Sequence, residues 1–162
     1  MYQKDFIIFL IEQFARLVAR IVAMITNREY DDAAFYIEQV YRQYLGVNSD
    51  LINAFSYRSL MSMMKIDPEA YGDKCIVLAE LLRLEGRMFF EQGNMKEGFG
   101  RNLKSLNIFL TIFREDDGGH EEHHAKALEA AANLEEIAAK TDYEMPAETR
   151  AMLDRFLDSV NR

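Results

Sequence analysis

The chain has 162 residues, 49% of them hydrophobic, and a formal net charge of -8 at pH 7. This length is typical of one domain with its own core, so we expect a single domain over residues 1–162. The net charge is negative, and no basic face with interspersed aromatic residues is present, which argues against nucleic-acid binding. The single cysteine, Cys75, excludes an internal disulfide and fits a reducing, cytoplasmic compartment.

The first predicted element is a helix over residues 6–25, an apolar stretch interrupted by the charges of Glu12, Arg16 and Arg20. A charged residue near the middle of a membrane span costs about 2.5 to 3.5 kcal/mol, and no small-residue cleavage site follows a basic leader. We therefore expect neither a membrane span nor a signal peptide. The narrow polar stripe requires protein cover on the other sides, either from the same domain or from a second copy in a homodimer.

Two further helices are predicted before the middle of the chain. Residues 29–46 have apolar positions at helical spacing and end at Gly46, so that residues 5–45 form a first helical hairpin. A third helix is expected from Ser49 to Lys65. It ends before Pro68, because a proline pushes the preceding residue out of the helical region.

The clearest pattern lies in residues 81–113, where two apolar stripes flank Gly93-Asn94. Gly93 suits the left-handed conformation that ends a helix, and Asn94 with Glu97 three residues later suits an N-cap with a capping box. The sequence therefore predicts two antiparallel helices. A glycine inside a helix costs up to about 1 kcal/mol relative to alanine, which close packing of two helices offsets. The small residues expected at this close crossing are Gly86, Gly98 and Ser105, and the same close packing is expected to offset the cost of Gly100.

Residues 86–106, GRMFFEQGNMKEGFGRNLKSL, resemble a tetratricopeptide repeat. In that family a glycine is followed three residues later by an aromatic residue, then by a Gly-Asn or Gly-Asp turn and two small residues on the second helix. These places are filled by Gly86, Phe89, Gly93-Asn94, Gly98 and Ser105. The resemblance covers about one repeat, and Asn102 stands where a bulky residue is usual. It implies an all-α fold with about seven helices in antiparallel hairpins, arranged as a right-handed tetratricopeptide-like stack that binds other proteins.

The negative charge is concentrated between Glu115 and Glu148. A helix is expected over residues 120–140, where alanines form a small-residue face that allows close approach of a neighbouring helix. A last amphipathic helix is expected to open at Pro146, because proline suits the first turn of a helix. This helix is predicted to cap the stack.

Sequence motifs for catalysis are absent: there is no phosphate-binding loop, nucleophile elbow, CxxC pair or dinucleotide fingerprint. We expect no cofactor and no catalysis. The candidate metal ligands are His120, His123 and His124, whose spacing brings His120 next to both others on a helix; the alternative is a solvated polar turn. A carboxylate metal bundle needs Glu-x-x-His on each of two helices, and only residues 121–124 have this pattern.

The predicted partner-binding residues lie on the first helix of the repeat-like hairpin. The resemblance implies that this helix lines the concave face of the stack, where Arg83 and Arg87 match positions that hold a partner's terminal carboxylate in some family members. Two adjacent cations can fork around a carboxylate. The alternative is a solvated salt-bridge ladder with Glu80 and Glu91. The predicted partner-binding set is Glu80, Arg83, Arg87 and Phe90.

The sequence therefore predicts a non-catalytic protein-protein interaction or scaffolding module that binds a peptide or protein on its concave helix face. One alternative function is a self-associating structural protein, a homodimer through the helix over residues 6–25. A more remote alternative is a metal-binding helical bundle.

Overall fold

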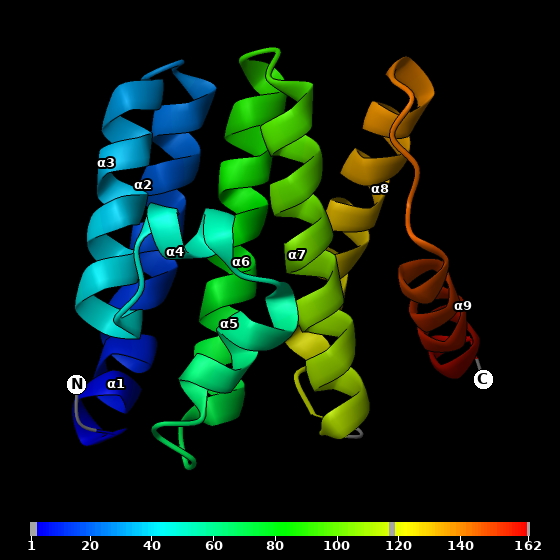
Figure 1. The fold of residues 1–162 in the computed structure, drawn as a ribbon. Helices are drawn as coiled ribbons and strands as arrows, with labels where there is room; N and C mark the ends of the chain where they lie inside the picture. The colour runs from blue at the N-terminus through cyan, green and yellow to red at the C-terminus, as the bar shows by residue number, and fades with distance from the viewer. Residues whose placement is uncertain (1–2, 117–118, 162) are drawn as a thin grey trace. The chain divides into compact units, whose positions relative to one another are not determined.

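The computed structural model describes residues 3–116 and 119–161 (Figure 1). These residues form helices and no strand, which confirms the predicted all-α class. The chain divides into two compact units, residues 1–74 and residues 75–162. Among the described residues, no helix combines the length and the apolar character that a membrane span requires.

The first unit begins with two helical rods that form the predicted first hairpin. One rod consists of α1 (Gln3–Phe9), a π-helical turn (Leu10–Phe14) and α2 (Ala15–Thr26). The other consists of α3 (Tyr30–Val40) and a second π-helical turn (Tyr41–Leu45). The two rods lie side by side in Figure 1.

An aromatic pair joins these two rods near their π-helical turns. The rings of Phe9 and Tyr44 stack with centroids 3.7 Å apart, and the Tyr44 hydroxyl donates a hydrogen bond to Gln13 Oε1 at 3.0 Å. Stacked aromatic rings stabilise a packing interface beyond their buried area. This pair therefore helps to fix how the two rods of the hairpin pack.

The predicted single helix from Ser49 to Lys65 is wrong, because the chain breaks in its middle. The structure has α4 (Ser49–Ala54) and α5 (Tyr57–Met64) instead, with Phe55 in an extended conformation between them. Ser56 causes the restart, since its hydroxyl accepts a hydrogen bond from the Ser59 backbone N–H at 3.2 Å and caps α5. A serine that satisfies the first turn of a new helix competes with continuation of the old one.

The second unit is built on the predicted hairpin of α6 (Tyr71–Glu91) and α7 (Met95–Glu115), although the first four residues of α6 belong to the first unit. The turn lies at the predicted place. Gly93 has a φ of +81°, and the Asn94 side chain accepts a hydrogen bond from the Glu97 backbone N–H at 3.3 Å. Both the left-handed helix end and the N-cap are therefore confirmed.

Helices α6 and α7 approach closely, as the small residues predict. A Cβ atom on Gly98 would lie 3.2 Å from the backbone nitrogen of Phe90 and 3.3 Å from the carbonyl oxygen of Gly86. Ser105 donates a hydrogen bond from its hydroxyl to the Ala79 carbonyl oxygen at 2.7 Å. The prediction is wrong for Gly100, because a Cβ there would meet no described atom within 4 Å beyond its own turn of helix.

Two more helices pack on α7. Helix α8 (His124–Lys140) follows a 3-10 turn (Glu121–His123), and its alanine-rich face is buried against α7. Helix α9 (Ala147–Val160) follows Pro146 and also packs on α7. Thr149 of α9 donates a hydrogen bond to Asn107 Oδ1 of α7 at 2.7 Å. Helix α7 is therefore the central element of the second unit.

Candidate binding face on helices α6 and α8

Helices α6 and α8 contact each other through polar side chains and run in the same direction. Lys126 Nζ of α8 lies 3.6 Å from Glu80 Oε1 of α6, and further along, Lys140 Nζ of α8 lies 5.2 Å from the centre of the Phe90 ring of α6. Residue numbers rise together along both helices, so the two are parallel. We call this surface the α6–α8 face; its residues are Glu80, Arg83, Arg87, Phe90, Lys126, Glu129 and Lys140.

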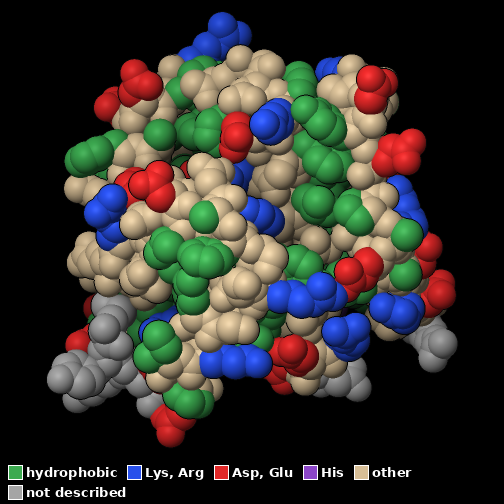
Figure 2. All heavy atoms as spheres, viewed as in Figure 1, with side chains coloured by type: hydrophobic (Ala, Val, Ile, Leu, Met, Phe, Trp, Pro, Cys, Tyr) green, Lys and Arg blue, Asp and Glu red, His purple; other side chains and the backbone are tan. Residues whose placement is uncertain are grey.

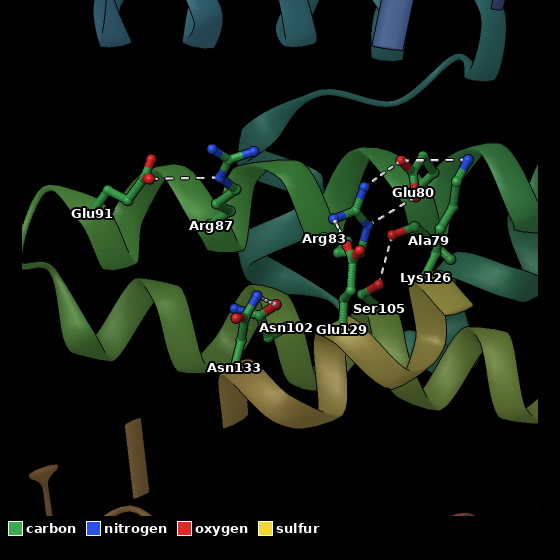
Figure 3. A network of polar contacts seen from close by, with 10 residues as sticks. All are labelled: Ala79, Glu80, Arg83, Arg87, Glu91, Asn102, Ser105, Lys126, Glu129 and Asn133. Atoms are coloured by element: carbon green, nitrogen blue, oxygen red, sulfur yellow. Dashed lines mark hydrogen bonds and ion pairs between the residues drawn. The ribbon is translucent and has the colours of Figure 1, made fainter. Parts of the chain in front are cut away.

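Arg83 is the centre of the α6–α8 face, and its charge is held by two carboxylates (Figure 3). Its Nε and Nη2 donate to the two oxygens of Glu80 at 3.0 and 2.6 Å, and its Nη1 donates to Glu129 Oε2 at 2.6 Å. Glu80 is fully buried and the Arg83 side chain is 8% exposed, whereas the Glu129 side chain is 61% exposed. The Arg83 guanidinium is therefore held by the buried carboxylate of Glu80 and covered on its other side by the exposed carboxylate of Glu129.

The pKa of Arg83 reflects this arrangement. Burial acts to lower the pKa, but the hydrogen bonds and charge of Glu80, together with the charge of Glu129, outweigh burial and raise the pKa above its ordinary value. The guanidinium remains charged, and a buried charge requires a fixed counter-charge. Glu80 supplies that counter-charge. It lies three residues away on the same helix, so the helix backbone keeps its carboxylate next to Arg83.

Arg87 and Phe90 lie nearer the end of α6 and are only partly buried. Arg87 Nε lies 3.6 Å from Glu91 Oε1, one turn further along the helix, and Figure 3 shows this pair apart from the Arg83 cluster. Arg83 and Arg87 thus pair with different carboxylates and do not form one open clamp. The ladder of Glu80, Arg83, Arg87 and Glu91 that we considered from the sequence is present, but its Arg83 end is buried.

Two asparagine side chains next to the Arg83 cluster connect α7 with α8, and one of them also packs against α6. Asn102 of α7 donates from Nδ2 to the Gly98 carbonyl oxygen at 2.8 Å, and Asn133 of α8 donates to Asn102 Oδ1 at 3.4 Å. Asn102 is fully buried, and its side chain occupies the space that a Cβ on Gly86 would need. The unusual asparagine in the repeat-like pattern therefore fills the gap left by a glycine on the facing helix.

A second buried ion pair holds α6 to α7. Arg101 Nε of α7 lies 3.2 Å from Glu85 Oε1 of α6, and both side chains are buried. Lys104, one turn further along α7, has a lowered pKa because it is partly buried and lies near the charge of Arg101. The interior of the second unit thus contains fixed charges on α6 that are neutralised by both α7 and α8.

Sequence reasoning missed the residues of α8. Lys126, Glu129 and Asn133 recur at spacings of three and four, which places them on one side of a helix. That pattern alone indicates a polar stripe, and the sequence gives no sign that the stripe faces α6. The signal was present in the spacing, but the pairing of α6 with α8 depends on how both pack against α7.

Two of the three candidate metal ligands lie near each other, with the ring centroids of His120 and His123 6.4 Å apart. His120 Nε2 lies 3.0 Å from Asp116 Oδ2, whereas the His124 ring packs edge-on against Phe113 and Phe156. Burial, followed by the charge of Lys126, lowers the pKa of His123. Within residues 3–116 and 119–161, no group of three or more His, Cys, Asp or Glu side chains is placed to hold a metal ion.

Comparison of the chain with protein-family models, with curated proteins and with solved structures gives no match.

Proposed function

We propose that this chain is a non-catalytic, cytoplasmic interaction module that binds an acidic peptide segment of a partner protein along the α6–α8 face. The observation that carries the proposal is the Arg83–Glu129 contact, in which a buried guanidinium already holds an exposed carboxylate from another helix. A partner's carboxylate can take the place of Glu129 without disturbing Glu80. Arginine favours such exchange, because its planar fork fits any carboxylate.

Further cations on the α6–α8 face support binding of an extended acidic segment. Arg87, Lys126 and Lys140 are each partly exposed and lie along the same pair of helices as Arg83. Arg87 lies 3.6 Å from Glu91 and Lys140 lies 3.4 Å from Glu136, each within its own helix, and exposed ion pairs of this kind contribute little to stability. A row of acidic side chains would exchange with both of these surface contacts at once, and Phe90 offers an adjacent apolar surface.

The resemblance to tetratricopeptide repeats agrees with this proposal. In such a stack, the first helices of successive hairpins lie parallel and line the surface that holds the partner. Helices α6 and α8 are parallel and are separated in sequence by α7, which is the order expected for two first helices. We add that Arg83 and Arg87 bind separate carboxylates, which belong to one extended acidic segment.

The experiment is a titration of the full chain into a fluorescein-labelled oligoglutamate peptide, followed by fluorescence anisotropy. We expect saturable binding that weakens as salt is raised, because exposed charge pairs are screened. Arg87→Glu should weaken binding by about tenfold or more, since it replaces an attraction by a repulsion. Lys96→Glu, which makes the same charge change at an exposed residue outside the α6–α8 face, should not.

Two outcomes would overturn the proposal. One is the absence of saturable binding by a folded wild-type chain at low salt. The other is an equal loss of affinity in the Arg87→Glu and Lys96→Glu variants, which would mean that the peptide responds only to net charge.

A second candidate function is self-association through the N-terminal helix. The observation that favours it is that Ile7 and Ile8 of α1 are 40% and 41% exposed, although apolar side chains of this size gain free energy from burial. Light scattering tests this function. A dimer that Ile8→Lys converts to a monomer supports self-association, whereas a wild-type monomer at all concentrations contradicts it.

A further inference from the structure

A cavity of about 860 Å³ lies in the second unit, away from the residues of the α6–α8 face. It is enclosed by the last turns of α7, the beginning of α8 and the C-terminal half of α9. The lining residues on α9 recur at helical spacing from Met152 to Val160, so one side of that helix faces the cavity. A volume in this range is typical of sites for small molecules.

The inner wall of the cavity is apolar and aromatic. Leu110 and Phe113 of α7 and Met152 and Phe156 of α9 line it, and all four are buried. The rings of Phe113 and Phe156 lie 5.5 Å apart, and the His124 ring packs edge-on against both of them. These packed rings give the cavity a fixed wall that favours the apolar body of a ligand.

Two arginines stand at the opening of the cavity. Arg114 on α7 and Arg155 on α9 line it, and both are exposed. Within the described part of the chain, neither guanidinium has a hydrogen-bond or ion-pair partner. Figure 2 shows Lys and Arg side chains, interspersed with acidic ones, on the surface over the ends of α7 and α9. Among the described lining residues, Glu121 is the one acidic side chain, so two positive charges face one negative charge there.

This local excess of positive charge contrasts with the net charge of -8 of the chain. A cavity with an apolar wall and unpaired guanidinium groups at its opening favours a ligand that has an apolar body and an anionic head group. The apolar part gains free energy by leaving water, and an anionic head group forms charge-assisted hydrogen bonds with arginine. A neutral ligand of the same size would form no charge-assisted hydrogen bond with either arginine.

We infer that the cavity between α7, α8 and α9 binds a small amphipathic carboxylic acid, with its apolar body against Phe113 and Phe156 and its carboxylate between Arg114 and Arg155. This site is separate from the α6–α8 face, so its ligand is independent of the partner protein proposed above. The chain would therefore sense or carry a fatty or aryl acid as well as bind a protein.

Isothermal titration calorimetry of the full chain with decanoate, below the concentration at which decanoate forms micelles, tests the inference. Decanol is the matched ligand without the charge. We expect decanoate to bind at least about tenfold more tightly than decanol, because only the carboxylate pairs with the arginines. Arg114→Gln and Arg155→Gln should each weaken decanoate binding by about tenfold and leave decanol binding unchanged.

Two further variants sharpen the test. Glu121→Gln removes the acidic side chain that the structure describes in the lining and should tighten decanoate binding. Arg150→Gln removes the same charge from the same helix as Arg155 but at a residue that pairs with Glu135, and it should leave the affinity unchanged. Equal affinities for decanoate and decanol would overturn the inference. So would an unchanged affinity in both arginine variants, or no binding by the folded chain.

Discussion

The Arg83 guanidinium of α6 and the Glu129 carboxylate of α8 meet at 2.6 Å, although 46 positions separate them in the sequence. The same guanidinium holds Glu80 through two hydrogen bonds. One of its carboxylate partners is fully buried and the other is mostly exposed. From this difference we expect Glu80 to be a structural residue and Glu129 to be exchangeable, and the first two of the following predictions separate the two roles.

Glu80→Gln should destabilise the protein strongly. It leaves the mostly buried Arg83 guanidinium without its main counter-charge, and removal of one partner from a buried ion pair typically costs about 3 to 5 kcal/mol. Urea denaturation should show a lower midpoint with an unchanged slope. A loss below about 1 kcal/mol would show that Arg83 finds compensation in Glu129 alone.

Glu129→Gln should change the stability by less than about 1 kcal/mol, because its carboxylate is largely in water and exposed ion pairs contribute little. The same urea experiment measures it, next to Glu80→Gln. If the two substitutions cost the same, Glu129 is as structural as Glu80, and a partner cannot replace it.

Two neighbouring glycines of α7 should respond in opposite directions to alanine. Gly98→Ala places a Cβ 3.2 Å from the Phe90 backbone nitrogen, and backbone atoms of a packed helix cannot yield easily, so we expect a loss of stability. Gly100→Ala meets no described neighbour within 4 Å and should stabilise by up to about 1 kcal/mol, since alanine is the better helix former. Thermal unfolding of both variants checks this. A stabilised Gly98→Ala would contradict the close crossing of α6 and α7.

Glu38 should make the first unit sensitive to acid. Burial acts to raise the pKa of Glu38, but hydrogen bonds from Ser49 and Arg42 outweigh it and hold the pKa below its ordinary value. A carboxylate with a lowered pKa stabilises the fold above its unfolded pKa, about 4.3 for glutamate, and this stabilisation is lost as the pH falls through the lowered value.

Glu38→Gln should therefore reduce the free energy of unfolding at neutral pH, and the difference from wild type should shrink as the pH falls below about 4. Urea titrations at several pH values measure the difference. Glu69→Gln, at an exposed residue of the same unit, is the control and should show a smaller change. A Glu38→Gln penalty that grows toward acidic pH would have the wrong sign.

Local signals made part of the fold predictable. The helix end at Gly93 and the N-cap at Asn94 depend on residues within one turn of each other, so the sequence alone located them. The break before Ser56 was missed because apolar residues continue through it at helical spacing, and a single serine decides where the next helix begins. Gly100 was misjudged for a related reason, since its presence in a helix does not say which side it faces.

The candidate face was predictable only on one of its two helices. Glu80, Arg83 and Arg87 are neighbours on α6 by spacing alone, and the sequence placed them on one surface. The contribution of α8 depends on the packing of two helices on a third, which no local pattern specifies. For this reason Arg83 was expected to be open to a ligand, whereas in the structure the Glu129 carboxylate of α8 covers its guanidinium.

The measurement that tests the central claim most directly is the affinity of the Glu129→Gln variant for the oligoglutamate peptide, relative to wild type. If a partner's carboxylate takes the place of Glu129 on Arg83, removal of that internal competitor should raise the affinity by up to about fivefold, the factor that corresponds to an exposed contact worth about 1 kcal/mol. Glu144→Gln makes the same charge change in the exposed loop before α9 and should have little effect. An affinity that stays the same or falls in Glu129→Gln, or rises equally in both variants, would contradict the account.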